Sequence, residues 1–129
     1  MLTLEVITPT GKVLSAEVES VTAPGVQGQF QVLDHHRPLL SILGGGALSY
    51  TGAKESGELL IRGGVAEVNA EGKMLVLTDE VQRLDALDRE RAQKIKAEAE
   101  AAFSGAYLDD SAVDRLRQDL VFAEAVLSR

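Results

Sequence analysis

Residues 65–103 read VAEVNAEGKMLVLTDEVQRLDALDRERAQKIKAEAEAAF, and the periodicity of their apolar residues changes within the stretch. Up to Thr78, short apolar runs alternate with polar residues or end at glycine, which is typical of β-strands. From about Asp85, apolar residues recur at the spacing of one helix face. We therefore predict a β-rich domain over residues 1–84 and a helical domain over residues 85–129.

The region before Thr78 consists of short β-rich runs separated by turn residues. All three prolines and every glycine except Gly105 lie in it. Strands spaced in this way, with no pattern of a crossover helix between them, favour an antiparallel sandwich or barrel over a parallel sheet. The predicted runs are residues 2–6, 13–21, 30–33, 39–43, 47–51, 59–61, 65–68 and 74–77.

The last 45 or so residues have the pattern of two helices joined by a short turn. Asp85 or Asp88 can cap the first helix, Ser104-Gly105 can end it, and Ser111 can begin the second. The apolar seam of the second helix is narrow and is predicted to meet one partner helix rather than a broad core. Because a short helix pair buries little apolar surface, we expect this hairpin to be less stable than the sandwich. The seam residues are Val113, Leu116, Leu120, Ala123 and Leu127.

The composition excludes several functional classes. The chain carries 20 acidic against 13 basic residues, and a net charge of −7 argues against a nucleic-acid partner, whose binding needs clustered Lys and Arg. Without cysteine the chain has no disulfides, thiolate metal sites or thiol nucleophile. No apolar run approaches the roughly 20 residues that cross a bilayer, and the N-terminus does not have the pattern of a signal peptide. We therefore expect a cytoplasm-facing compartment.

The sequence gives little sign of an active site. Gly44-Gly45-Gly46 lacks the Lys and Ser or Thr of a phosphate-binding loop, and no nucleophile elbow is present. His35 and His36 are adjacent, and neighbouring side chains on an extended segment point in opposite directions, so a shared metal ion is not expected. We expect no catalytic residues and no metal site. An enzyme with a cryptic carboxylate site would have to show turnover by the isolated chain.

Six segments, in chain order, resemble one known family. They are residues 4–11 (LEVITPTG), 21–30 (VTAPGVQGQF), 36–40 (HRPLL), 63–68 (GGVAEV), 76–79 (VLTD) and 87–92 (LDRERA). Together they resemble the epsilon subunit of the bacterial and chloroplast rotary ATP synthase. The resemblance implies a ten-stranded β-sandwich followed by a helical hairpin, in agreement with the periodicity.

The resemblance also implies a function. Such a subunit is a non-catalytic part of the rotor in the central stalk, where it binds the gamma shaft and the ring of c subunits. Its hairpin folds onto the sandwich or extends to the alpha/beta catalytic head and inhibits ATP hydrolysis. The implied location is the cytoplasmic face of the bacterial plasma membrane or the stromal face of the thylakoid, with membrane association only through the complex. A free-standing β-sandwich adaptor with a helical tail is the alternative that composition and periodicity allow.

The resemblance assigns the contact with the c-ring to the glycine-rich bend, with Gln29 as the candidate. His36 and Pro38 either belong to the loops that approach the ring or form a merely structural turn. Gln27 and Gln29 stand where the family commonly has acidic residues. A neutral amide keeps a hydrogen bond but loses a charge-assisted contact. We therefore expect the location of this contact to be retained and its strength to be lower.

The LDRERA segment, residues 87–92, has two interpretations. In some family members it binds ATP, without a metal, as a regulatory ligand rather than a required cofactor. The candidate residues for ATP are Leu87, Asp88, Arg91 and Ala92, with Arg115 and Arg117 on the second helix. In the structural alternative, Asp88 caps the helix, Leu87 packs on the sandwich and Arg91 pairs with an acid.

A basic cluster at the start of the first helix is the last candidate site. Its members are Arg89, Arg91, Lys94 and Lys96. Either they form a solvated face, or they dock the extended helix on an acidic segment of the catalytic head by charge attraction.

Overall fold

The computed structural model describes residues 1–105 and 107–129, which form an eight-stranded sheet followed by two helices. Neither helix in the described part of the chain is both long and apolar enough to cross a membrane. The strands are β1 (Leu2–Thr8), β2 (Gly11–Val18), β3 (Ser20–Gly25), β4 (Gly28–Leu33), β5 (Leu39–Thr51), β6 (Ser56–Val68), β7 (Lys73–Leu77) and β8 (Val81–Arg83). The helices are α1 (Arg89–Phe103) and α2 (Asp110–Leu127).

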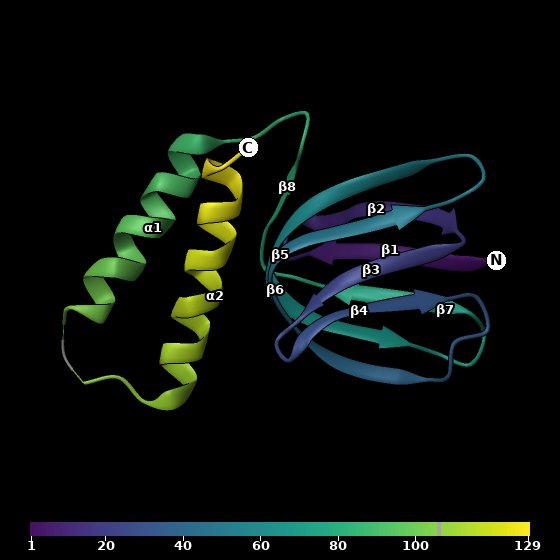
Figure 1. Cartoon of the computed structure of the whole chain (residues 1–129), viewed down its shortest axis with the longest axis horizontal. Coiled ribbons are helices and arrows are strands. Elements are labelled where there is room, and N and C mark those ends of the chain that lie inside the picture. Colours follow the sequence, from purple (N-terminus) through teal and green to yellow (C-terminus); the bar gives the residue numbers. More distant parts are fainter. Residues whose placement is uncertain (106) are drawn as a thin grey trace.

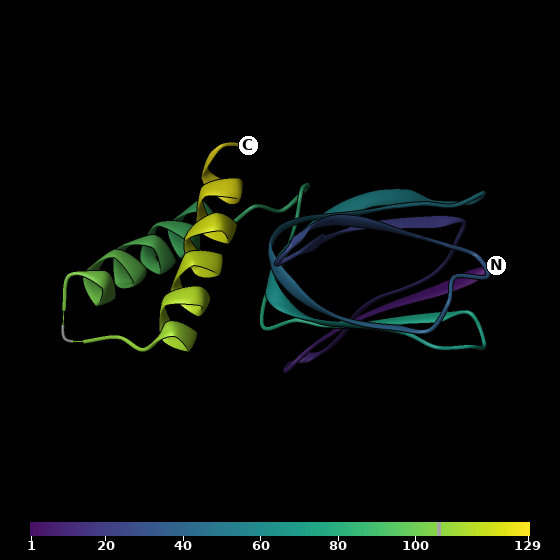
Figure 2. The same ribbon diagram turned by 60° about the horizontal axis from the view of Figure 1, so that its bottom comes forward.

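The sheet folds over on itself into two layers, as Figures 1 and 2 show. Its strand order is β2-β1-β7-β6-β5-β3-β4, and β8 pairs with β6 beside this path. All neighbours are antiparallel except β1 and β7, which run parallel. The predicted sandwich is therefore confirmed, with one parallel pair at the point where the N-terminal strand joins the sheet.

Two long strands connect the layers. β5 and β6 are each 13 residues long and run through the glycines that the sequence analysis treated as breaks, residues 44–46 and 63–64. Gly46, Gly63 and Gly64 have positive φ angles, which only glycine adopts without strain, so the strands bend there without ending. One end of β6 pairs with β7 and the other with β8. The sandwich therefore has eight strands and not the ten that the resemblance implied, because β5 and β6 each continue through a bend.

Two further strand boundaries differ from the prediction. The predicted run 13–21 is divided between β2 and β3, which meet at Glu19. Strand β8 was not predicted, because its three residues are too few to show an alternating pattern.

The main core lies between the two layers. It is built from residues that alternate inward along the strands, so that each layer contributes one apolar face. Its largest fully buried side chains include Leu2, Leu4, Leu43, Leu48 and Ile61. A second, smaller cluster lies under the hairpin and joins it to the sandwich through a single fully buried strand residue, Leu60.

Helix α1 begins and ends where the sequence predicts, whereas the N-cap of α2 is Asp109 and not the predicted Ser111, two residues later. Asp88 is the N-cap of α1 and accepts a hydrogen bond from the Arg91 backbone nitrogen at 2.9 Å. Asp109 is the N-cap of α2, and Ser104 follows the last turn of α1. The two helices pack side by side, with α2 between α1 and the sandwich (Figure 1).

One prediction for the hairpin is wrong. The seam of α2 was expected to serve a single partner helix, but α2 also packs on β5 and β6. Phe122 and Val126, which lie outside the predicted seam, are fully buried with Leu60 in the second cluster. The reason is that α2 is covered on two sides, by α1 and by the sheet, so its apolar surface is wider than a coiled-coil stripe.

Candidate functional site

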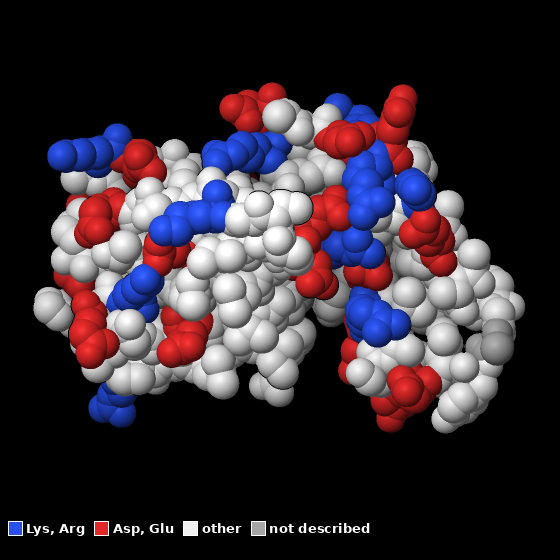
Figure 3. Space-filling model, turned by 180° about the vertical axis from the view of Figure 1, so that it is seen from behind, with Lys and Arg blue, Asp and Glu red and all other residues white. Residues whose placement is uncertain are grey.

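Four charged side chains from four different elements meet at the junction between the sandwich and the hairpin. The Arg62 Nε on β6 donates to the Asp119 Oδ1 on α2 at 2.8 Å, and its Nη1 donates to the Glu80 Oε1 at 3.3 Å. The Arg91 Nη2 on α1 donates to the same Glu80 oxygen at 2.9 Å. Figure 3 shows a column of Lys and Arg, interleaved with Asp and Glu, along this junction. The network ties both helices to the sheet.

Backbone contacts hold the same junction in place. Glu80 lies in the turn between β7 and β8, and its carbonyl oxygen accepts from the Arg62 backbone nitrogen at 2.9 Å. The buried Gln82 side chain accepts from the Asp88 backbone nitrogen at 2.8 Å and donates to the Asp88 carbonyl oxygen at 3.2 Å. The start of α1 is therefore fixed to β8 at the residue that caps it.

The charges in this network stabilise one another. The hydrogen bond to Asp119 is the main reason that the pKa of Arg62 is raised above its ordinary value. The hydrogen bond to Glu80 raises the pKa of Arg91, although the nearby charge of Arg62 opposes this increase. The two guanidinium groups are thus close enough to repel each other, and the Glu80 carboxylate between them compensates for that repulsion.

The structure brings together only some of the residues predicted to bind ATP. Asp88 and Arg91 line a shallow hollow of about 350 Å³ beside β8, together with Glu80 and Gln82. Leu87 and Ala92 face the second apolar cluster instead. Arg115 and Arg117 are both exposed on α2 and do not line the hollow.

These contacts match the structural interpretation of the 87–92 segment. Asp88 caps α1, Leu87 packs against the cluster that includes Leu60, and Arg91 pairs with an acid, Glu80. ATP binding stays a prediction.

The basic cluster of α1 is partly used within the folded hairpin. The Arg89 guanidinium donates to the Arg129 carbonyl oxygen, and Arg91 is engaged by Glu80. Lys94 is exposed and Lys96 is half-buried. Docking of these residues on a partner stays a prediction.

Helix α2 contacts the sheet with its own backbone. The Gly45 backbone nitrogen donates to the Gln118 Oε1 at 2.7 Å. A methyl group at Gly45 would overlap the Gln118 carbonyl oxygen and lie 3.0 Å from the Phe122 backbone nitrogen. Gly44 and Gly45, which lack the pattern of a phosphate-binding loop, therefore lie directly under α2.

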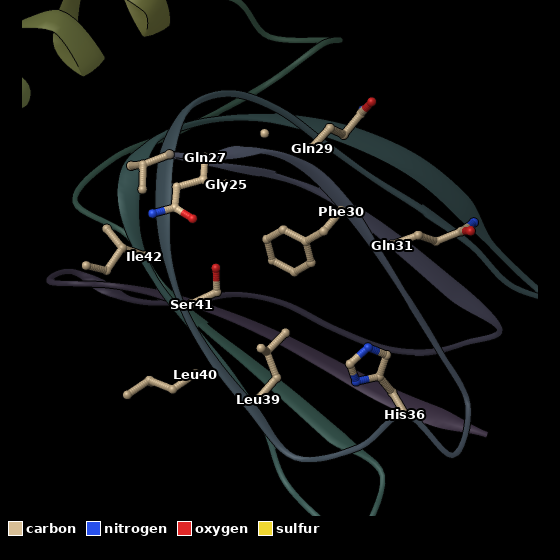
Figure 4. A pocket seen from close by; sticks show the side chains of 12 residues that line it. Gly25, Gln27, Gln29, Phe30, Gln31, His36, Leu39, Leu40, Ser41 and Ile42 are labelled. Atoms are coloured by element: carbon tan, nitrogen blue, oxygen red, sulfur yellow. The ribbon is translucent and has the colours of Figure 1, made fainter.

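At the other candidate site, Gln29 and His36 line one hollow of about 640 Å³, which Figure 4 shows. Phe30 projects into this hollow from β4, whereas Gln29 and Gln31 point outward (Figure 4). Pro38 lines a neighbouring hollow that shares Leu39 and Leu40 with the first. The structure thus places the three predicted ring-contact residues around two adjoining hollows, and the contact itself stays a prediction.

The outer face of one layer carries an apolar row that was not predicted from the sequence. Ile42 on β5 pairs with Val65 on β6, Val65 with Leu77 on β7, and Leu77 with Ile7 on β1. Paired residues lie on the same face, so the four side chains are adjacent. Ile42 is 64% exposed, Leu77 47% and Val65 37%. The signal in the sequence was that runs 39–43 and 74–77 are apolar on both faces rather than alternating.

Next to this row on the same face lies a charged group. Glu5 of β1 is paired with both Lys12 of β2 and Lys73 of β7. Hydrogen bonds from Lys12 and then from Lys73 lower the pKa of Glu5 to about 2.

Comparison with known proteins identifies the family. Residues 1–84 match the family model described as ATP synthase, Delta/Epsilon chain, beta-sandwich domain. The ATP synthase epsilon chain of Nitratidesulfovibrio vulgaris is 41% identical over 99 residues, which are 77% of this chain and 73% of that protein. The epsilon chain of Geobacter metallireducens is 38% identical over 109 residues, or 84% of this chain and 78% of that protein.

A solved structure has the same fold. A chain in the Euglena gracilis mitochondrial ATP synthase superposes with a TM-score of 0.73 at 24% identity, covering 98% of this chain and 79% of that one. The family match and the identities with named relatives extend the agreement from fold to family. The chain therefore belongs to the family of ATP synthase epsilon chains.

Proposed function

We propose that this chain is a non-catalytic subunit of the rotor in the central stalk of ATP synthase, where it couples ion flow through the c-ring to rotary ATP synthesis. Family membership supports this role. The observation that carries it is the apolar row Ile42–Val65–Leu77–Ile7 on the outside of the sandwich. A sheet face of this kind is typical of a surface that a partner protein covers.

The partner assigned to the apolar row is the gamma shaft. A rotor subunit needs a lasting attachment to the shaft, and buried apolar contacts supply most of the free energy of such interfaces. The Glu5–Lys12–Lys73 group beside the row gives the interface a polar rim.

The c-ring is assigned to the surface around the two adjoining hollows, which carries Gln29, His36 and Pro38. The exposed Gln29 amide can donate and accept hydrogen bonds, and the hollow behind it, into which Phe30 projects, can receive a side chain of a ring loop. The chain then reaches the membrane only through the complex, on the cytoplasmic face of the bacterial plasma membrane.

The hairpin is assigned a regulatory role. In the folded position it lies on β5 and β6; in an extended position it would reach the alpha/beta catalytic head and inhibit ATP hydrolysis. The small size of the cluster that joins it to the sandwich supports such a change of position. ATP bound without a metal at Asp88 and Arg91 is proposed as the regulatory ligand, and no cofactor is required.

The experiment is retention of the tagged full-length chain on the shaft. Ile42→Asp places a charge in the apolar row but leaves the core intact, because the side chain points outward. We expect this variant to bind the shaft subunit at least tenfold more weakly, since even one buried unpaired charge costs more than about 1.4 kcal/mol. Leu33→Asp is the matched control, because Leu33 is 52% exposed on β4 and lies outside the row. Equal retention of both variants would exclude the row as the shaft interface.

A further inference from the structure

Glu80 occupies the place where an anionic ligand would meet the junction. Its carboxylate receives hydrogen bonds from both Arg62 and Arg91, and its side chain is 22% exposed. It also lies in the wall of the same hollow that contains Asp88 and Arg91. A phosphate group that approached Arg91 would therefore meet a carboxylate already bound there.

The position of Glu80 is set by the sheet rather than by its side chain. The backbone hydrogen bond from Arg62 holds the turn between β7 and β8 against β6, so the backbone that carries the Glu80 carboxylate is placed by the sheet and not by the helices. A charge that is already in place needs little ordering when its partner arrives. Arg91 on α1 can thus pair with Glu80 whenever the hairpin approaches the sandwich.

The second helix is held by the other side of Arg62. Asp119 of α2 binds the Arg62 Nε at 2.8 Å, and its side chain is only 14% exposed. Each guanidinium therefore has a carboxylate partner, and each helix contributes one member to the network. Neutralising Glu80 would leave Arg62 and Arg91 facing each other with no anion between them.

We propose that Glu80 is the resident anion of the Arg62–Arg91 pair and that it holds the hairpin on the sandwich with no nucleotide bound. An oxyanion such as the phosphate chain of ATP has to displace the Glu80 carboxylate before it binds the pair, so it binds the wild-type chain much more weakly than a chain without this charge. This inference rests on the proposed regulatory role of the hairpin, because it names the contact that sets the balance between its positions.

The test is amide hydrogen exchange of the full-length chain in EDTA, with and without inorganic pyrophosphate or ATP. Glu80→Gln keeps the shape of the side chain and removes its charge. We expect exchange in α1 and α2 to become faster by on the order of tenfold, the size of one lost charge-assisted hydrogen bond, while the sandwich is unchanged. Millimolar pyrophosphate should restore protection in Glu80→Gln and have a much weaker effect on the wild-type chain, in which it has to compete with Glu80.

Two further variants separate this inference from a general loss of stability. Asp119→Asn also removes a carboxylate from Arg62 but leaves Glu80 in place, so it should loosen the helices without gaining a response to pyrophosphate. Glu58→Gln removes the partner of Arg129 elsewhere at the sandwich–hairpin boundary and serves as the matched control. It should show neither effect of Glu80→Gln.

Two results would overturn the inference. One is protection of the wild-type helices by pyrophosphate or ATP as strong as that of Glu80→Gln. The other is unchanged exchange in Glu80→Gln. Retention of Glu80→Gln on the shaft subunit is measured in parallel and should equal that of the wild type, because the apolar row is untouched. Normal retention with either overturning result would reject the role of Glu80 alone, whereas loss of shaft binding by the wild type would reject the proposed function.

Discussion

A methyl group at Gly45 is predicted to move the hairpin off the sandwich without harming the sandwich itself. Gly45 lies under α2, where a Cβ atom would overlap the Gln118 carbonyl oxygen and press on the Phe122 backbone nitrogen. Both atoms belong to the helix backbone, so no side chain can turn aside to make room. The φ angle of Gly45 is not in the left-handed region, so Ala at this position has no backbone strain of its own.

The size of the effect follows from the two ways in which the chain can respond. If the hairpin stays docked, α2 has to shift outward, and overpacking of this kind costs about 1–3 kcal/mol, with rigid backbone contacts at the upper end. If the hairpin leaves, Phe122 and Val126 lose their burial, which is worth up to about 1.5–3 kcal/mol each. The chain takes whichever of these two responses costs less free energy. We therefore expect Gly45→Ala to disfavour docking by about 2–3 kcal/mol, or roughly 30–150-fold in the ratio of docked to undocked chains.

Hydrogen exchange resolved along the chain measures this ratio. Amides of α2 should lose protection by that factor in Gly45→Ala, and amides of β1 and β7 should keep theirs. Gly44→Ala should have a smaller effect, because its Cβ would lie 2.6 Å from the Gln118 Oε1, which belongs to a side chain that can move. It should cost only about 1 kcal/mol, the value of one hydrogen bond. Gly105→Ala, whose nearest atom would lie at 3.5 Å, should change nothing.

The same variant has a consequence in the assembled complex. If the undocked hairpin is the inhibitory one, Gly45→Ala should lower ATP hydrolysis, and deletion of residues 85–129 should raise hydrolysis in both backgrounds. Unchanged protection of α2 in Gly45→Ala would refute the reasoning, since it would mean that the helix does not rest on the sheet at this glycine.

The other two predictions concern Glu5 on the outer face of the sandwich and Gln29, which is proposed to contact the c-ring. Glu5→Gln should destabilise the chain at neutral pH by removing both lysine pairs; since the folded-state pKa of Glu5 is lowered from 4.5 to about 2, the difference from wild type should be constant above about pH 5 and shrink as the pH falls through that window in acid-unfolding curves. Gln29→Glu should strengthen retention on the isolated c-ring by about 0.5–1 kcal/mol, because a partly solvated charge-assisted contact replaces a neutral one. Retention that does not change across a range of salt concentrations would remove Gln29 from that interface.

The β-strands were predicted well where alternation is local, and less well where the backbone bends. Residues 2–6 and 74–77 appear as β1 and β7 because their apolar side chains mark one buried face. Gly44–Gly46 and Gly63–Gly64 looked like chain breaks, since glycine usually ends a strand pattern. In the structure these glycines let the long strand pair β5–β6 bend and take part in both layers. This is visible only from the pairing of β5 and β6 with strands that are distant in the sequence.

The caps of the helices could be predicted from the sequence to within two residues, but the junction could not. Asp88 was predicted correctly, because a cap acts within three residues of its own position. The cap of α2 was predicted two residues too late, because Asp109, Asp110 and Ser111 are adjacent and each is a residue type that caps helices. Arg62 and Asp119 are 57 residues apart, and their contact depends on how α2 lies across β6. Glu80 is unremarkable in sequence, being one acid among 20, and acquires its role only through the turn that presents it to two arginines.

The kinds of contact at the junction explain why the hairpin can leave while the sandwich stays folded. The sandwich core is closed by buried apolar side chains of every strand from β1 to β7, so opening it exposes all of them together. The junction depends instead on three features: the one fully buried strand residue Leu60, the close approach of α2 to Gly45, and a network of paired charges. When the hairpin leaves, water can form hydrogen bonds with each of these charges. Undocking therefore costs only the burial of a few side chains around Phe122 and the net value of the ion pairs, which is small for partly exposed groups. A partner that binds the released helices needs to supply no more than this to hold them extended.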